Sequence, residues 1–424
     1  MSKQKLRSLG RRALIVLLIA GAVILLRETG YYAGLREKLT RGSEYQEAVP
    51  NAANPAPVHP LGAVQPLAAV VNLGGGEHCG AAYDAERVTE IFRRFSADFG
   101  EALGSAGAPE PITEEQFRVC LNSSGVYLRF YCPQPLELLS VWLGAEIGGN
   151  AVLHSAELLC LCVDGSEALL CYRTEEKEYY SCTTAVSAER LRSRTAEFSG
   201  DGVQFAFENE LLQGGDGCAV LCGGSRSVSD VRCTVPQPGK TETDTLLRSV
   251  GMNSYVTGSY AEADGTVVYI DEEGTLRLSP AGSLNYRCPE FPGSAETQSL
   301  TETVALAWQM AETCAGAGCG DGTLLFAGAS FVGAQNSWTV CFDYAVGGIP
   351  VRLASGPAVE IVLRGGRLIQ ARMQLNRFSL SEERTMLLPD LQALAIAAAA
   401  DSAAELCYSA GGEIMNCDWV KTDG

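Results

Sequence analysis

The sequence predicts an α+β protein: an N-terminal transmembrane helix plus two α+β domains with antiparallel meander sheets flanked by helices. The clearest indication is GTVVYIDEEGTLRLSPAGSLNY (265–286), where Asp/Glu/Gly and Pro/Gly clusters separate three short strands of period-two alternation. Predicted helices and strands also occur in blocks, whereas a parallel sheet would require them to alternate. In addition, an apolar run, ALIVLLIAGAVILL (13–26), lies close to the N-terminus.

The apolar run at 13–26 predicts a membrane anchor. Its helix would be roughly 21 Å long at ~1.5 Å per residue, shorter than the ~30 Å hydrocarbon core of a bilayer. Arg12 and Arg27 flank the run and can extend their charged ends toward the headgroups. Because basic residues precede the run and no acidic residue occurs before Glu28, we expect the N-terminus in the cytoplasm and the bulk of the chain outside. A cleaved signal peptide stays open as an alternative, because the length also suits one.

Composition and periodicity divide the chain into five segments. The stretch EAVPNAANPAPVHPLGAVQP is rich in Pro and Ala and lacks periodicity, which is typical of a spacer. A second such stretch, TVPQPGKTETD (234–244), separates two regions that each combine helices with strands. The predicted segments are a cytoplasmic basic tail (1–12), a transmembrane anchor (13–29), a spacer (30–66), an N-terminal α+β domain (67–235) and a C-terminal α+β domain (236–424).

The N-terminal domain is expected to begin with two helices. The first starts at Asp84 and carries an apolar stripe at 3.6-residue spacing. The stripe consists of Val88, Ile91, Phe92, Phe95, Phe99 and Leu103. The second helix follows a capping box from Thr113 to Gln116, which satisfies free amides of its first turn. After them we expect a strand at 125–132, a short helix at 135–144, strands at 156–163, 167–173 and 178–184, and a helix that opens at Ser187.

The C-terminal domain is expected to open with a short helix, followed by the meander at 265–286. An Ala-rich helix and a block of strands follow, because apolar alternation resumes after the glycine-rich stretch GAGCGDG (316–322). The expected elements are helices at 242–250 and 299–315, strands near 323–327, 337–345, 349–354 and 357–364, a continuation through GGRLIQARMQLNRF, a helix from Pro389 and a strand pair near 404–420.

Charge argues against two classes of partner. The chain has 32 basic and 50 acidic residues, a net charge of −18. Residues 1–27 include several Lys and Arg and no Asp or Glu, so the remainder of the chain is still more acidic than the whole. Nucleic acid and anionic membrane surfaces repel such a surface, and we expect neither as a partner of the folded part.

The sixteen cysteines do not form a recognisable framework. They make up about 4% of the residues, below the ~8–10% typical of a disulfide scaffold. Cys160 and Cys162 share one face of a predicted strand, Cys171 falls in the next, and Cys120 lies on a predicted amphipathic helix, all positions where cysteine acts as a small apolar residue. No C-x-x-C pair occurs, so a zinc ribbon or a thioredoxin-like site has no support. We expect most thiols to be reduced and buried.

Candidate catalytic motifs are weak. GGGEHCG (74–80) places Glu77, His78 and Cys79 together, the ingredients of a thiol nucleophile, but neighbours in the chain do not generally point at one another. We interpret this stretch as a loop leading into the helix at Asp84. GAGCGDG lacks the Lys-Ser/Thr of a phosphate loop. No catalytic residue, cofactor or metal site is predicted, although two distant carboxylates could still form a glycosidase site.

Three C-terminal stretches resemble the YycH/YycI family: YAEADGTVVYIDEEGTLRLSPAGSLNYR (260–287), WTVCFDYAVGGIPVRLASGPAVEIVLRGGRLIQARMQLNRF (338–378) and LLPDLQALAIA (387–397). The second also resembles PepSY-type modules, in which an x-G-x-P-V hairpin precedes an A-V-E-I-x-V-x-x-G-R-L strand pair. Those positions are Gly348 to Val351 and Ala358 to Leu368. Proteins of the YycH/YycI family are membrane-anchored regulators of the sensor histidine kinase that controls cell-wall metabolism.

The resemblance implies a non-enzymatic, single-pass membrane protein without a cofactor, which modulates a two-component sensor histidine kinase. A paralogous regulator is a second candidate partner. Such regulators contact the kinase through membrane helices, which associate in lipid by close packing at small residues. The small residues available in the anchor are Ala13, Ala20, Gly21 and Ala22. The alternative, a cell-surface enzyme or ligand-binding protein acting on wall polymer or peptide, stays open.

Overall fold

The computed structural model describes residues 64–145, 154–212, 215–224, 226–288, 298–400, 402–409 and 413–423. The predicted anchor at 13–29 therefore lies outside the described residues. Among the residues that are described, no helix is long and apolar enough to cross a membrane. All of them belong to one compact unit, Ala56–Gly424.

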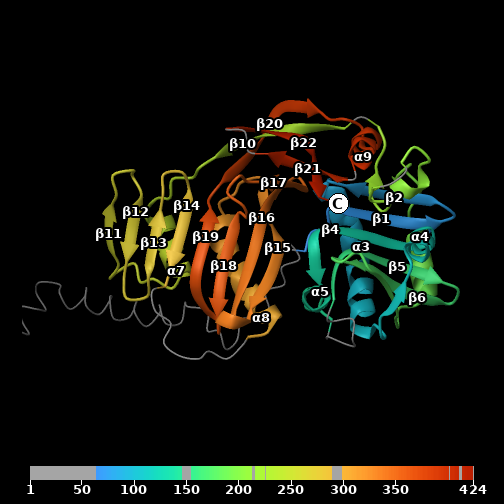
Figure 1. Ribbon diagram of the computed structural model, residues 1–424, viewed down its shortest axis with the longest axis horizontal. Coiled ribbons are helices and arrows are strands. Elements are labelled where there is room, and N and C mark those ends of the chain that lie inside the picture. The colour runs from blue at the N-terminus through green and yellow to red at the C-terminus, as the bar shows by residue number, and fades with distance from the viewer. Residues whose placement is uncertain are drawn as a thin grey trace, which may run out of the picture. The chain divides into compact units, whose positions relative to one another are not determined.

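Within the described residues, the first sheet has seven antiparallel strands, and Figure 1 shows its arrangement. They are β1 (Ala68–Gly74), β2 (Glu77–Ala82), β3 (Glu110–Ile112), β4 (Gly125–Pro135), β5 (Ser155–Asp164), β6 (Glu167–Thr174) and β7 (Tyr179–Thr183). Their order in the sheet is β2-β1-β4-β5-β6-β7-β3. Alternate side chains of the strands point to opposite faces, so the sheet can take a layer of helices on each side.

Helices cover both faces of this sheet. On one face, α3 (Ala85–Ser105), α5 (Leu136–Trp142) and α6 (Ala188–Thr195) share the main hydrophobic core. On the other face, α4 (Glu114–Leu121) buries Phe117 and Leu121 in a second core. A short hairpin of β8 (Gln204–Phe205) and β9 (Val220–Leu221), with the 3-10 turn η2 (Ala206–Glu208), joins the second core.

Three of the predicted helix starts, at Asp84, Thr113 and Ser187, are confirmed. Asp84 caps α3 by accepting a hydrogen bond from the Arg87 amide at 3.1 Å. Thr113 and Gln116 form the predicted capping box of α4. Ser187 caps α6 in the same way. These side chains satisfy amides that the first helical turn leaves without a partner, which is why the sequence marks the starts clearly.

The second sheet has thirteen strands. They are β10 (Ser227–Thr234), β11 (Gly258–Ala261), β12 (Val267–Ile270), β13 (Thr275–Leu278), β14 (Ser283–Arg287), β15 (Gly322–Val332), β16 (Ser337–Val346), β17 (Ile349–Arg352), β18 (Val359–Arg364), β19 (Arg367–Gln374), β20 (Arg377–Met386), β21 (Ser402–Ser409) and β22 (Ile414–Asp423). Their order is β11-β12-β13-β14-β19-β18-β16-β17-β21-β22-β10-β20, and β15 pairs with β16. The predicted meander is β12-β13-β14, and Figure 1 shows how it continues into β19 and β18.

Three helices and two short helical turns accompany this sheet. They are α7 (Lys240–Ser249), α8 (Leu300–Ala311), α9 (Asp390–Ala398), the π-helical turn η3 (Glu312–Gly316) and the 3-10 turn η4 (Gly333–Gln335). Residues of α7, α8 and η3 enter the main core together with those of β13, β14 and β16. Among the strands that the structure describes, every pair is antiparallel except β17 with β21. The fold class, α+β with antiparallel sheets, is thus confirmed for the part of the chain that the structure describes.

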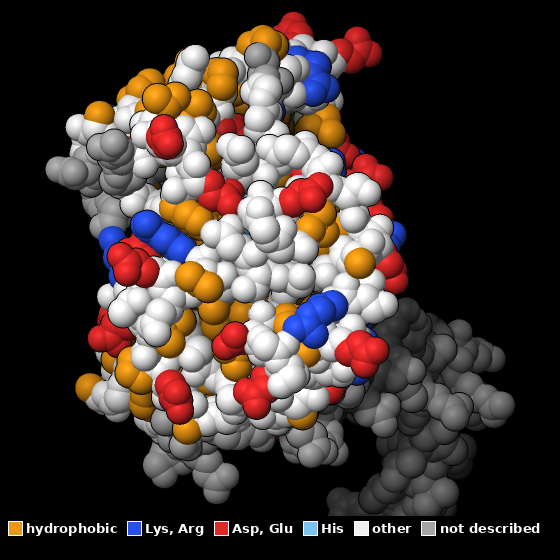
Figure 2. Space-filling model, turned by 90° about the vertical axis from the view of Figure 1, so that its right-hand side faces the viewer, with side chains coloured by type: hydrophobic (Ala, Val, Ile, Leu, Met, Phe, Trp, Pro, Cys, Tyr) orange, Lys and Arg blue, Asp and Glu red, His pale blue; other side chains and the backbone are white. Residues whose placement is uncertain are grey.

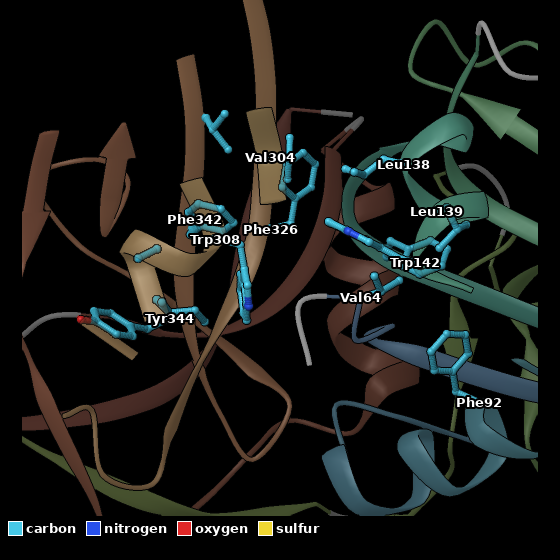
Figure 3. Packing of buried hydrophobic residues seen from close by; sticks show 14 of the residues in the cluster. Val64, Phe92, Leu138, Leu139, Trp142, Val304, Trp308, Phe326, Phe342 and Tyr344 are labelled. Carbon is cyan, nitrogen blue, oxygen red and sulfur yellow. The ribbon is translucent and has the colours of Figure 1, made fainter. Parts of the chain in front are cut away.

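One hydrophobic core extends from the first sheet's helices to the second sheet. Trp142 of α5 meets Phe326 of β15 edge to face, with ring centroids 5.8 Å apart (Figure 3). Phe326 in turn meets Phe342 of β16, and Phe342 meets Trp308 of α8. The division into domains at residue 235 stays a prediction. The structure adds that β10, which precedes that boundary, pairs with β20 and β22 of the second sheet.

The surface reflects the acidic composition. Figure 2 shows one face, on which acidic side chains are spread among polar and apolar ones and basic side chains are sparser. Many arginines of the described residues are paired with carboxylates, for example Arg367 with Glu273 at 2.6 Å. Exposed pairs of this kind contribute little to stability.

Candidate functional site

The stretch predicted as a glycine-rich loop is the β1–β2 hairpin. Gly74, Gly75 and Gly76 all have positive φ angles, 94°, 67° and 79°, and form its turn. Glu77, His78 and Cys79 then lie on β2, so the interpretation of 77–80 as a loop is wrong. Successive residues of a strand point to opposite faces, and His78 and Cys79 therefore do not face each other.

His78 lies in a buried polar network. It is 2% exposed, its Nδ1 is 2.9 Å from Asn72 Oδ1, and its Nε2 is 2.9 Å from Glu208 Oε1. The other carboxylate oxygen of Glu208 accepts a hydrogen bond from the Phe205 amide. These bonds tie the β1–β2 hairpin to the β8–β9 hairpin, which indicates a structural role for His78.

Cys79 has a different neighbourhood, on the side of α3. Its Sγ is 3.7 Å from a guanidinium nitrogen of Arg87, and Arg87 pairs with Asp201. Burial raises the pKa of the Cys79 thiol, and the hydrogen bond from Arg87 opposes that effect only in part. A thiol with a raised pKa carries little thiolate at neutral pH and is a poor nucleophile. Glu77, His78 and Cys79 are not brought together as a catalytic group.

A cleft of about 390 Å³ opens beside the ion pair of Arg87 and Asp201. Its lining includes Arg87 of α3, Arg226 just before β10, and Arg384 of β20. Arg384 donates from Nε to Ser227 Oγ at 2.7 Å, whereas Arg226 lies 3.7 Å from the Asp390 carboxylate. One buried guanidinium nitrogen of Arg226, Nη1, has no hydrogen-bond partner among the described residues. Asp84 and Asp201 also line the cleft, and Asp201 pairs with Arg87, so Arg226 is the arginine best placed to bind an anionic ligand.

No sequence motif marks this cleft. Arg226 and Arg384 are more than a hundred residues apart in the chain, and the pairing of β10 with β20 brings them to one place. Sequence reasoning missed both residues. No local signal in the sequence distinguishes them from the other arginines of the chain.

A largely buried ion network links strands β4, β5 and β6 of the first sheet to Asp216. The Asp216 carboxylate is 2.8 Å from Arg129 and 2.9 Å from Arg173. Glu157 pairs with the same two arginines, at 3.1 and 2.9 Å. Burial would raise the pKa of Asp216, but the two guanidinium groups outweigh it and hold that pKa well below its usual range. All members are paired with one another, which indicates a structural network.

The groups best suited to hold a metal are thiols. In the part of the chain that the structure describes, no cysteine is more than partly exposed. Cys120 of α4, Cys162 of β5 and Cys171 of β6 place their Sγ atoms within 4.8 Å of one another. The predicted membrane-contact residues Ala13, Ala20, Gly21 and Ala22 lie outside the described residues.

Comparisons with known proteins identify a fold. No protein-family model matches the chain, and no curated protein matches its sequence. Among solved structures, the crystal structure of YycH from Bacillus subtilis is similar, with a TM-score of 0.56 and 10% sequence identity. The match covers 85% of this chain and 93% of that chain. Likeness to YycI and to PepSY-type modules stays a prediction. At this identity the comparison shows the fold alone, and the chain has a YycH-like fold.

Proposed function

We propose that this protein is a membrane-anchored regulator, without enzymatic activity of its own, that modulates a sensor histidine kinase by direct contact. The observation that carries the proposal is the YycH-like fold over most of both chains. The sequence resemblance of 260–287 and 338–378 to the YycH/YycI family supports it independently. Those stretches form the meander and strands β16 to β19 of the large sheet.

The anchor is the first part of the proposed contact. Residues 13–29 hold the protein in the cell membrane with its N-terminus in the cytoplasm, and the folded part lies outside. The small residues Ala13, Ala20, Gly21 and Ala22 allow a kinase helix to approach closely within the lipid. Among them, Gly21 permits the closest approach of two backbones.

The second part of the proposed contact with the kinase is the edge of the thirteen-stranded sheet. Strand β11 is the terminal strand of the order, and all four of its residues are exposed. Tyr260 on β11 is 51% exposed, and Val256 just before it is 72% exposed. An edge strand presents backbone groups that an extended segment of another protein can pair with, and we assign this role to an extracytoplasmic segment of the kinase.

Site-specific cross-linking in membranes tests the proposal. A photoreactive residue replaces Tyr260 in the full-length protein, and a matched variant carries it at Val119 on α4, which is 66% exposed. We expect a sensor histidine kinase among the products captured from Tyr260 and a much lower yield from Val119. Repeated capture of wall-polymer enzymes alone from both positions would contradict the proposal.

The arginine-lined cleft favours one second candidate function, the binding of an anionic wall fragment or acidic peptide. Arg226 would be central, because it is the cleft arginine with a buried nitrogen that lacks a partner among the described residues. Titration with isolated wall fragments and with acidic peptides tests this candidate. Binding that Arg226→Met abolishes and Arg248→Met retains would support it, whereas equal binding by both variants would exclude the cleft.

A further inference from the structure

Three thiols converge between helix α4 and the first sheet. The Cys171 thiol is 3.5 Å from the Cys120 sulfur, and both lie within 4.8 Å of the Cys162 sulfur. In the part of the chain that the structure describes, no other three Cys, His, Asp or Glu side chains form such a group.

The elements that carry the three sulfurs are rigid. Cys162 lies on β5, and Cys171 lies on the adjacent β6, directly opposite Cys160 in the ladder. Helix α4, which carries Cys120, is fixed by its capping box and by Phe117 and Leu121, both fully buried. Ligands on paired strands and a capped helix are held more accurately than ligands on loops.

We propose that Cys120, Cys162 and Cys171 bind one soft d¹⁰ metal ion, Zn²⁺ or Cu⁺. With metal–sulfur bonds of about 2.3 Å, three coordinating sulfurs lie about 4 Å apart. The observed separations require adjustments of about 1 Å or less to reach that geometry. Thiolate sulfur selects such ions over Mg²⁺ and Ca²⁺, which prefer oxygen.

The surroundings of the site suit a metal held by sulfur. The second hydrophobic core encloses it, and Cys160 points to the same face of β5, with its thiol 3.9 Å from the Cys120 carbonyl oxygen. Cys160 is therefore the sulfur available as a fourth ligand. Cys120 is partly exposed and provides a route for the ion from the surface. Each coordinating thiol loses its proton, so three ligands release three protons to solvent when they bind.

Metal titration of the full-length protein under anaerobic conditions tests the proposal. Zn²⁺ and Cu⁺ are added separately, each in competition with a chromophoric chelator. Variants Cys120→Ala and Cys171→Ala remove ligands, and Cys182→Ala is the matched control, because Cys182 is a buried thiol on β7 of the same sheet. We expect one ion per chain in the wild type and the control. Loss of a residue that only supports a metal ligand weakens binding by at most about 100-fold. Because Cys120→Ala and Cys171→Ala each remove a ligand itself, their metal affinity should fall by more than about 100-fold.

X-ray absorption of the loaded wild type gives a readout that does not depend on the folding of any variant. We expect three or four sulfur ligands around the ion, whereas coordination mainly by oxygen or nitrogen would overturn the proposal. It would also be overturned if folded Cys120→Ala and Cys171→Ala bound as tightly as the wild type. Isolation of the protein with a Cys120–Cys171 disulfide, and no metal uptake after reduction, would likewise contradict it.

Discussion

The Tyr131 hydroxyl of β4 donates a hydrogen bond to the Asp343 carboxylate of β16 at 2.9 Å, which joins the two sheets. Asp343 also accepts from the Ala358 amide at 2.9 Å. Burial raises the pKa of Asp343, and these hydrogen bonds reduce the rise only in part. The link between the sheets is therefore made by a carboxylate whose charged form is disfavoured.

Substitutions of Tyr131 and of Asp343 should change the free energy of unfolding by different amounts. Tyr131→Phe leaves the buried Oδ2 of Asp343 without its donor and should lower the free energy of unfolding by about 2 kcal/mol. Asp343→Asn keeps an oxygen for the Ala358 amide and removes a disfavoured charge, so its effect at neutral pH should stay within about 1 kcal/mol. Urea unfolding of both variants measures the difference, and a larger loss in Asp343→Asn would contradict the assignment.

The same link predicts a pH dependence. Because the folded-state pKa of Asp343 lies above its unfolded value, its favourable contribution is present below about pH 4 and is lost as the pH rises through the folded-state pKa. The stability of Asp343→Asn relative to the wild type should therefore increase as the pH rises from 4. A relative stability that is constant or falls over that range would contradict the direction of the shift.

Asp216 should behave in the opposite way. Its pKa is lowered by Arg129 and Arg173, so its contribution is present above about pH 4 and is lost as the pH falls below that value. Asp216→Asn leaves two largely buried guanidinium groups undercompensated and should cost about 3 kcal/mol at neutral pH. The control is Glu273→Gln in the exposed Arg367 pair, which should cost less than about 1 kcal/mol. Equal losses in the two variants would show that the Asp216 network is not structural.

Trp142 should be a main contributor to the core shared by the sheets. It is 4% exposed and packs edge to face on Phe326. Trp142→Ala should lower the free energy of unfolding by about 3–5 kcal/mol. Its neighbour Val141 is 38% exposed, and Val141→Ala should change stability by about 0.5 kcal/mol or less. Thermal unfolding of both variants gives a second measurement. Two separate transitions in Trp142→Ala, with a single transition in Val141→Ala, would show that the Trp142 contact couples the unfolding of the two sheets.

The cysteines should be free and protected from solvent. We expect slow alkylation of the native protein, because none of the described cysteines is more than partly exposed. After denaturation without reductant we expect labelling of all sixteen thiols, because no disulfide joins two of them in the described residues. Mass spectrometry counts the labels. Fewer labels after denaturation, restored only by reductant, would show disulfides instead.

The sequence predicted those elements whose signals are local. Capping side chains at Asp84, Thr113 and Ser187 marked three helix starts, and alternation with turn residues marked the meander. Strand β2 was missed because EHCGAA has no β-branched or aromatic residue and includes Gly80. That glycine is required by pairing with β1, since a Cβ at Gly80 would lie 2.9 Å from the Val70 Cα.

Long-range pairing explains the remaining misses. Strand β10 reads as a polar connection, and its partners β20 and β22 lie more than 140 residues further along the chain. The thiol site was predictable only in part. The common face of Cys160 and Cys162 follows from strand alternation, but nothing local indicates that α4 brings Cys120 to them.

Kinase activity in reconstituted membranes tests the central claim most directly. The sensor histidine kinase captured by cross-linking is placed in vesicles alone, with the full-length protein, with Gly21→Leu, or with a form whose residues 13–29 are replaced by an unrelated transmembrane helix. Our account predicts that the full-length protein changes the rate of kinase autophosphorylation and that both altered anchors reduce that change. An autophosphorylation rate that is the same with and without the full-length protein would contradict the account.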